Sequence, residues 1–332
     1  MSTTKSLAAA GLAVSTFLLT ACGDKPETTE ASLGVAEAAK AAYPEAPDAA
    51  MQYVAAELAS GNGGVLWEAM PASYQSDINK LAQLAGTKID GEIYDQVFGI
   101  VGRLGGVIDS KKEFILNTEL GGAQPPEQKA MMEEALPSIV SLIDTISSSP
   151  IASSAGLQSF DGQIFFDSTV SSLLKDIEAM SKLQGEEAAF SLADLGDMEI
   201  SVIDSTETTA TLKSTVAGQE PLEEAYSKIE GRWVPEELAT QWADGIGSAT
   251  AQLEAVTPEQ IEAQKPQAQM VLGMIDGVLT QLEGAETQAQ FDQALQGAMM
   301  PLMGLMMMGQ GMGAPPAAPD PLVPMPAPAP AQ

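Results

Sequence analysis

Two stretches of the chain repeat apolar residues at intervals of three and four, and this repeat is the strongest constraint on the fold. The first stretch contains Ile93, Val97, Ile100, Val101, Leu104, Val107 and Ile108. The second contains Met270, Val271, Met274, Ile275, Val278, Leu279 and Leu282. Such intervals place side chains on one face of an α-helix. The sequence therefore predicts two long amphipathic helices.

Local signals add further helices on both sides of the middle of the chain. Asp48 is a good N-cap for a helix that reaches Ser60. Thr257 and Gln260 form a capping box, with a proline at the first helical position between them. We expect other helices at residues 73–85, 126–146, 165–183, 235–246 and 286–308, and a connector at 111–120.

The period of the pattern changes from helical to alternating between about residues 198 and 234. Ile200 and Val202 alternate with polar neighbours, and Ala210 and Leu212 do the same. A third extended run follows at residues 226–233, interrupted by Gly231. This alternation is typical of strands. We therefore predict an α+β, mainly helical fold: helices, then a small three-stranded antiparallel sheet at about 198–234, then helices.

Charge and residue content exclude several classes of function. The chain has 15 Lys and Arg residues against 45 Asp and Glu residues, a formal net charge of −30. Nucleic-acid binding depends on basic residues that neutralise phosphates, so no nucleic-acid partner is expected. The chain contains no histidine, which removes Ser-His-Asp catalysis and histidine-ligated zinc. No cofactor is predicted.

The N-terminus reads as a secretion signal. The apolar run at residues 7–19 is shorter than the roughly 20 residues that a permanent membrane span needs. It is followed by Leu19-Thr20-Ala21-Cys22, which resembles the lipobox of bacterial lipoproteins. The resemblance implies a cleaved signal peptide at residues 1–21 and acyl chains on Cys22, the only cysteine of the chain. Through these acyl chains the membrane would be a partner.

The residue after Gly23 suggests where the protein resides, and the composition of the chain suggests how it is divided. Asp24 stands one place later than the acidic residue that retains lipoproteins in the inner membrane, which favours the outer membrane, facing the periplasm or the surface. We expect an acidic and Ala/Pro-rich tether at residues 22–47 and a disordered tail at 309–332. The body at 48–308 forms either one unit or two subdomains that divide near 190. It resembles uncharacterised envelope lipoproteins, a likeness that implies no activity.

A methionine cluster precedes the tail. Residues 299–312 contain Met299, Met300, Met303, Met306, Met307, Met308 and Met312. Thioethers are soft ligands that select Cu(I), so Met300, Met303 and Met307 are candidate ligands for Cu(I) or Ag(I). Methionine is also a flexible apolar side chain in cores and adaptable interfaces. We favour packing, in the core or against a partner, and keep the metal site as the alternative.

One pair of residues could form a nucleophile. Ser172 and Lys175 resemble the S-x-x-K motif of penicillin-recognising enzymes, although the companion motifs of those enzymes are missing. An ordinary amphipathic helix explains the same residues. Trp67, Trp233 and Trp242 could line a pocket, but their apolar neighbours favour core positions. The leading hypothesis is a lipid-anchored, non-enzymatic envelope protein that binds or scaffolds another molecule, with a protein as the candidate partner. A Ser-Lys hydrolase ranks third.

Overall fold

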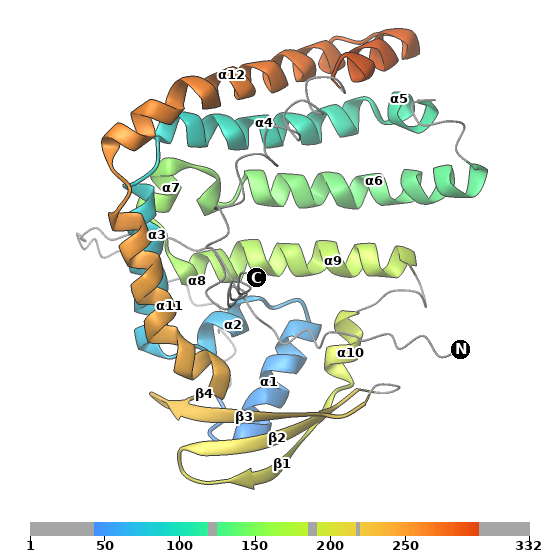
Figure 1. The fold of residues 1–332 in the computed structure, drawn as a ribbon. Helices are drawn as coiled ribbons and strands as arrows, with labels where there is room; N and C mark the ends of the chain where they lie inside the picture. Colours follow the sequence, from blue (N-terminus) through green and yellow to red (C-terminus); the bar gives the residue numbers. More distant parts are fainter. Residues whose placement is uncertain (1–42, 119–124, 185–190, 217–219, 299–332) are drawn as a thin grey trace, which may run out of the picture.

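The computed structural model describes residues 43–118, 125–184, 191–216 and 220–298. The expected signal peptide, Cys22, most of the tether and the whole tail lie outside these residues. The described part is mainly helical and has a four-stranded antiparallel sheet between α10 and α11, as the sequence predicts in outline (Figure 1). No helix in the described part of the chain is both long and apolar enough to cross a membrane.

The helices and strands follow one another in the order helices, sheet, helices. The first helices are α1 (Pro47–Ala59), α2 (Gly64–Glu68), α3 (Ala72–Gly86), α4 (Gly91–Ser110), α5 (Lys112–Asn117) and α6 (Pro126–Ser147). Then come η1 (Pro150–Ala152), α7 (Ser154–Gln158), α8 (Gly162–Phe165), η2 (Phe166–Val170), α9 (Ser171–Gln184) and α10 (Leu192–Gly196). The strands are β1 (Glu199–Ser205), β2 (Thr209–Thr215), β3 (Leu222–Ile229) and β4 (Arg232–Pro235). Last come α11 (Glu236–Glu254), α12 (Pro258–Glu283) and a helical stretch at 288–298.

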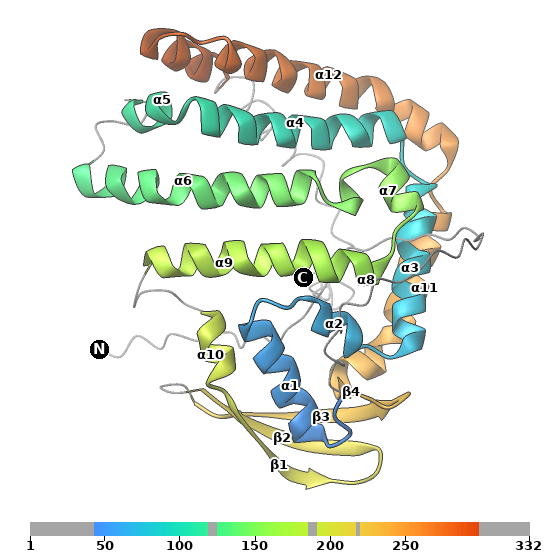
Figure 2. The same ribbon diagram turned by 180° about the vertical axis from the view of Figure 1, so that it is seen from behind.

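Four long helices lie side by side in one layer, in the order α12, α4, α6 and α9 (Figures 1 and 2). Lys265 of α12 bonds to Asp90 at the start of α4, and Arg103 of α4 bonds to Glu283 at the end of α12. These two contacts make α4 and α12 parallel. Helix α6 runs antiparallel to α4, because Gly102 lies beside Ser147 whereas Tyr94 donates a hydrogen bond to the carbonyl of Ile151.

Two upright helices, α3 and α11, close one end of this layer (Figure 1). They are joined by Tyr74 and Trp242, whose rings stack with centroids 3.9 Å apart. The indole N–H of Trp242 also donates to the carboxylate of Asp77, 3.1 Å away. Trp242 is therefore a packing residue, as are the buried Trp67 and Trp233, and the prediction of core positions is confirmed for these two.

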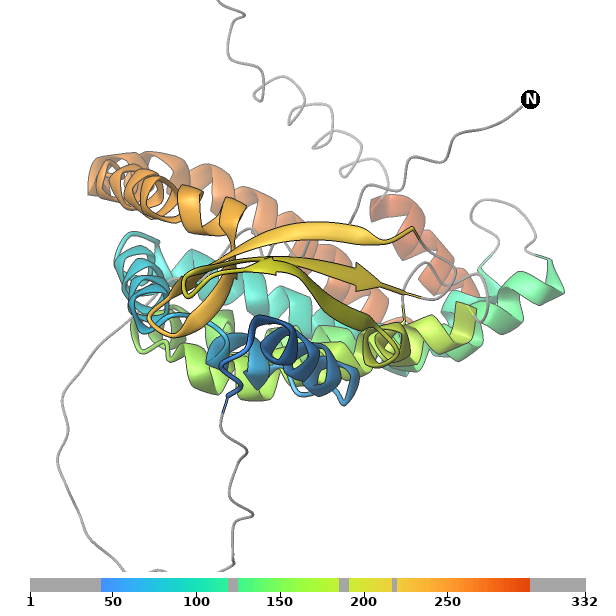
Figure 3. The same ribbon diagram turned by 90° about the horizontal axis from the view of Figure 1, so that it is seen from below.

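The sheet has one strand more than the sequence predicted. Its order is β1-β2-β3-β4, with every neighbouring pair antiparallel. Glu230 and Gly231 both have positive φ, at 49° and 80°, and form a two-residue turn that starts β4. The glycine that interrupts the third extended run therefore reverses the chain. Viewed from below, the sheet lies against α1 and below the helical layer (Figure 3).

Helix α1 covers one face of the sheet and builds a small core there. Ala50 of α1 packs with Ala210, Leu212 and Trp233 from the sheet. Trp233 also donates its indole N–H to the carbonyl of Glu45, at 2.8 Å. The sheet is thus fixed to the chain that precedes α1, about 190 residues earlier in the sequence.

A second core, which we call the aromatic core, joins α2, α3, α8 and η2. It contains Trp67, Ala82, Phe160, Phe165 and Phe166, all buried. Gly162 passes so close to Trp67 that a Cβ atom at this position would overlap the indole ring. Only glycine fits here without displacing the ring, so packing in the aromatic core leaves little free space.

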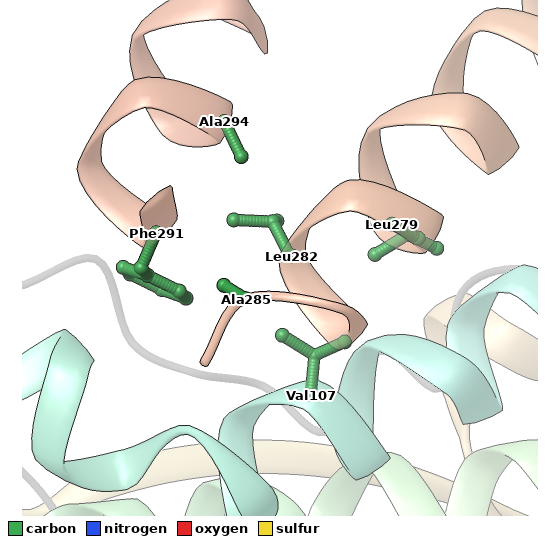
Figure 4. Packing of buried hydrophobic residues seen from close by; sticks show 6 residues of the cluster. All are labelled: Val107, Leu279, Leu282, Ala285, Phe291 and Ala294. Carbon is green, nitrogen blue, oxygen red and sulfur yellow. The ribbon is translucent and has the colours of Figure 1, made fainter. Parts of the chain in front are cut away.

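A third cluster fastens the end of the chain to the layer. Leu279, Leu282 and Ala285 from α12 and its end meet Phe291 and Ala294 of the helical stretch 288–298, with Val107 of α4 beneath them (Figure 4). The helical stretch therefore returns along α12 after a short turn. It packs where α4 and α12 meet.

Several local predictions change in detail. The expected connector at 111–120 contains the helix α5, whose Leu116 is buried. The helix expected from Phe165 is interrupted by η2, a five-residue π-helical turn. Asp48 is in the first turn of α1 and not its N-cap, because α1 begins at Pro47 and Ala46 holds the cap position. The capping box of Thr257 and Gln260 is confirmed.

Candidate functional site

The side of α4 that lies between its two neighbouring helices is apolar and open. Arg103 and Val107 point toward α12, whereas Gly102 and Gly105 lie against α6. With 100° between successive residues, Val97 and Leu104 project between these two contacts. Their side chains are 39% and 41% exposed. Part of the apolar surface of α4 therefore remains exposed to solvent.

Helices α6 and α9 continue the same side of the layer. In α6, Ile143 and Ser147 meet α4 and Thr145 meets α9, so Ile139 and Ile146 project between these contacts. Helix α6 runs antiparallel to α4. Ile139 and Ile146 therefore lie on the same side of the layer as Val97 and Leu104. Both isoleucines are only partly buried. Within α6, all of whose residues are described, only Leu136 is buried.

Helix α9 extends the surface to a third helix. Asp176 accepts hydrogen bonds from Ser141 and Thr145 of α6, at 2.7 and 3.1 Å. On the opposite side of α9, the Ser171 hydroxyl accepts from the backbone N–H of Gly63. Ile177 projects between these contacts and is 44% exposed. It lies on the same side of the layer as Leu104.

We call this surface the apolar face; it consists of Val97, Leu104, Met131, Ile139, Ile146 and Ile177. Met131, near the start of α6, is its most exposed member at 61%. The opposite side of α4 carries Glu92, Asp95, Gly99 and Gly106. Helix α4 is therefore amphipathic, with one apolar and one polar side. Large exposed apolar patches are typical of interaction sites, so this face is a candidate binding surface.

A small polar cleft of about 240 Å³ lies beside the aromatic core. Its lining includes Trp67, Glu68, Gln75, Gln163, Asp167 and Arg232. The Arg232 guanidinium donates from Nε to the carbonyl of Glu68, at 2.7 Å, and lies 4.2 Å from the centre of the Tyr43 ring. Asp167 belongs to the π-helical turn η2, an irregularity that is frequent at functional sites.

Burial dominates the electrostatics beside this cleft. The Tyr43 hydroxyl is buried and has no hydrogen-bond partner among the described residues. Burial raises the pKa of Tyr43 to about 12, although the nearby Arg232 cation acts in the opposite direction. The hydroxyl therefore stays protonated near neutral pH. The Tyr226 pKa is raised as well, by burial and by its hydrogen bond to Glu224.

A wider hollow of about 690 Å³ opens where α10 leads into β1. Gln52, Asp197, Glu199 and Lys213 are among the residues that line it. The Gln52 amide donates to the carbonyl of Met198, at 2.9 Å, and so closes one wall. The hollow is polar and open to solvent, and we assign no chemistry to it.

The Ser-Lys pair lies on α9. Ser172 is partly buried in the first turn, and Lys175 is exposed, with its aliphatic chain beside Gly61. These two described side chains form no hydrogen bond with each other. The buried serine of this turn is Ser171, which accepts from Gly63 and donates to the carbonyl of Phe166. Its hydroxyl therefore stabilises the junction between α2 and η2.

The remaining predicted site residues lie outside the described part of the chain. These are Cys22 and the candidate metal ligands Met300, Met303 and Met307. Among residues 43–118, 125–184, 191–216 and 220–298, no group of three or more Cys, Asp or Glu residues is arranged to hold a metal ion.

Sequence reasoning missed the polar cleft and saw only part of the apolar face. Glu68 and Arg232 are separated by 164 positions, and no motif connects them. The helical stripe that contains Val97 and Leu104 predicts an apolar face for α4, but not that this face stays open. Helices α6 and α9 also have apolar residues at helical spacing. Without the order of the helices in the layer, this spacing does not show that the three faces lie on one side.

Comparisons of this chain with models of protein families, with curated proteins and with solved structures give no match. The apolar face and the polar cleft are therefore the two candidate sites of this chain.

Proposed function

We propose that this protein is a lipid-anchored envelope protein that acts by binding a protein partner, not by catalysis. The anchor is the proposed lipidation of Cys22, and the binding surface is the apolar face. The observation that carries the proposal is the half-exposed row of apolar side chains on α4, α6 and α9. Removal of side chains such as Leu104 and Ile177 from water by a partner lowers the free energy and so favours binding.

The shape and charge of the molecule indicate the chemistry of the partner. Parallel and antiparallel helices side by side leave shallow grooves, which suit the apolar side of another helix. The chain carries a formal net charge of −30. Basic residues on the flanks of the partner's helix would therefore be attracted to the rim of the face and would accelerate association. The proposed partner is an envelope protein with an apolar helix between basic residues.

Capture from native membranes with the lipidated protein tests this proposal. The variant that carries Leu104→Asp and Ile177→Asp should lose a partner that the wild type retains, and a synthetic peptide of that partner's apolar helix should bind the purified wild type. Gly106→Asp, on the polar side of α4, is the matched control and should retain the partner. Capture that survives the double substitution would place the interaction elsewhere.

The anchor has its own test. Cys22→Ser should reduce incorporation of labelled palmitate to background, because no second cysteine is present. Labelling of the Cys22→Ser variant at the wild-type level would remove the lipoprotein assignment. The proposed binding surface does not depend on that outcome.

A second candidate function rests on the spacing of Met300, Met303 and Met307. We keep Cu(I) or Ag(I) binding by these thioethers as the alternative. An anaerobic Cu(I) titration of the full chain and of a chain ending at Gly297 distinguishes the two functions. Equal stoichiometry in both chains would exclude the methionine cluster as the metal site.

A further inference from the structure

We propose that residues 299–312 of this chain dock on the apolar face and cover it until a partner displaces them. The inference rests on the proposed function, because it assigns a regulator to the same surface. It combines two observations: where the described chain ends, and what the following residues are made of.

The described chain ends beside the apolar face. Phe291 and Ala294 pack on Leu282 at the junction of α12 and α4, and Ala298 is buried. Leu282 and Val271 lie on the side of α12 that continues the apolar side of α4. The helical stretch 288–298 therefore already covers the α12 end of that side. The described chain therefore ends next to the part that stays open.

The segment that follows, residues 299–312, is apolar and uncharged, so its composition is complementary to an apolar surface. No charged residue occurs between Asp292 and Asp320, in a chain that has 45 acidic residues. Residues 299–312 contain seven methionines and two leucines. Flexible, unbranched methionine side chains adapt to a surface made of isoleucine, leucine and valine. Contact of these apolar side chains with water is unfavourable, so burial of the segment against an apolar surface is favoured.

The segment is also long enough to reach all parts of the face. Packed helices lie about 8–10 Å apart, so α9 is about 16–20 Å from α4. Ten residues of extended chain reach about 33 Å. Residues 299–308 can therefore reach from α4 to Ile177 on α9. The segment belongs to the same chain, so its effective concentration at the face is high, in the millimolar range for short connections.

Photo-crosslinking in the full-length protein tests the docking. Benzoylphenylalanine at Leu104 should give crosslinks to residues 299–312 on irradiation, identified by mass spectrometry of peptides. The same group at Gly106 is the control and should give none, because a Cβ atom at this position, on the opposite side of α4, would have no neighbour within 4 Å among the described residues. Equal yields from both positions, or no yield from Leu104, would overturn the proposal.

Mixed isotopes decide which copy supplies the segment. Chains with natural and heavy nitrogen are mixed before irradiation, and crosslinks within one chain contain no mixed pairs. Mixed pairs in statistical proportion would show that a second copy occupies the face. Crosslinks from Leu104 to lipid alone would show that the membrane occupies it. Either result overturns the proposal.

A second measurement uses the neutral dye Nile red. The chain that ends at residue 298 should give several-fold higher dye fluorescence than the full chain, and Leu104→Asp with Ile177→Asp should remove this increase. An unchanged signal after truncation would contradict the docking. The two proposals can fail separately. If partner capture depends on the apolar face but truncation does not change the dye fluorescence, only the docking of residues 299–312 is wrong. Crosslinks to 299–312 with partner capture that ignores the face remove only the proposed function.

Discussion

The aromatic core around Trp67 and the four-helix layer differ in how completely they bury their apolar side chains. In the aromatic core, short elements close around Trp67, Phe160, Phe165 and Phe166 from several directions. In the layer, each inner helix has one long neighbour on either side, so part of its remaining surface faces solvent. Leu104 and Ile177 are therefore exposed by the architecture, although their sequence pattern is that of buried residues.

The comparison separates two uses of the same residue types. Apolar side chains that are enclosed contribute to the stability of the fold, because their burial is complete in the folded protein. Apolar side chains on the open face contribute little until something covers them. Substitutions in the two regions should therefore differ in which measurement they affect, stability or binding.

The largest effect is expected for truncation in the aromatic core. Trp67→Ala removes a buried indole that packs on Phe166 and should reduce the free energy of unfolding by about 3–5 kcal/mol. Urea denaturation followed by circular dichroism measures this loss. A loss below about 1 kcal/mol would show that the aromatic core is loosely packed.

Two glycine substitutions, one in each region, should change the free energy of unfolding in opposite directions. Gly162→Ala brings a methyl group into the Trp67 ring and should destabilise the protein by about 1–3 kcal/mol. Gly106→Ala lies on the open polar side of α4 and should stabilise it by about 0.5–1 kcal/mol, because alanine favours helix interiors. Denaturation midpoints of both variants, measured together, check the sign. Destabilisation by both would mean that the layer is as closely packed as the core.

A smaller effect is expected where α4 begins. Asp90 caps α4 by accepting from the backbone N–H of Ile93 and bonds to Lys265 of α12. That backbone hydrogen bond, followed by Lys265, lowers the pKa of Asp90 below its usual value. A lowered pKa in the folded state stabilises the protein above the ordinary pKa of about 3.9, and the contribution is lost as the pH falls further.

Asp90→Asn keeps the capping oxygen and removes the charge. The denaturation midpoint of this variant should lie slightly below the wild type at pH 7, and the two should converge below about pH 4. Asp90→Ala loses the cap as well and should lie lower at both values of pH. A difference between the wild type and Asp90→Asn that persists in acid would contradict the assigned pKa shift.

The smallest effect on stability is expected on the apolar face. In the chain that ends at residue 298, Leu104→Asp should change the free energy of unfolding by no more than about 0.5 kcal/mol, as for other exposed positions. The same substitution should have its effect in the capture experiment. If Leu104→Asp unfolds the protein, the apolar face is part of a core and not an exposed surface.

The sequence predicts helices better than it predicts how they pack. Thr257 and Gln260 carry a purely local signal, and the structure confirms both the capping box and the long helix after it. The stripe of α4 is equally clear. Its exposure could not be predicted, because it depends on α12 and α6, which pack on either side of it. The fourth strand was missed because Gly231 permits two interpretations, an interruption or a turn, and only the pairing of Lys228 with Trp233 decides between them.

The candidate sites differ in the same way. The apolar face could be predicted in part, since it is built from periodic helices. The polar cleft could not, because Glu68, Asp167 and Arg232 come from three separate elements and share no local pattern. Ser172 and Lys175 show the opposite case. Their spacing in the sequence suggests a nucleophile pair, but the two described side chains are not hydrogen-bonded to each other.

The pairing of α4 with α12 also has a consequence for the order of events when the chain is made. Arg103 meets Glu283, which is synthesised 180 residues later. Until then one long side of α4 has no neighbour, and its apolar residues are available to any binding protein that accompanies the nascent chain. Contacts this distant in sequence slow folding. We therefore expect the docking of α12 to be the last and slowest step of assembly.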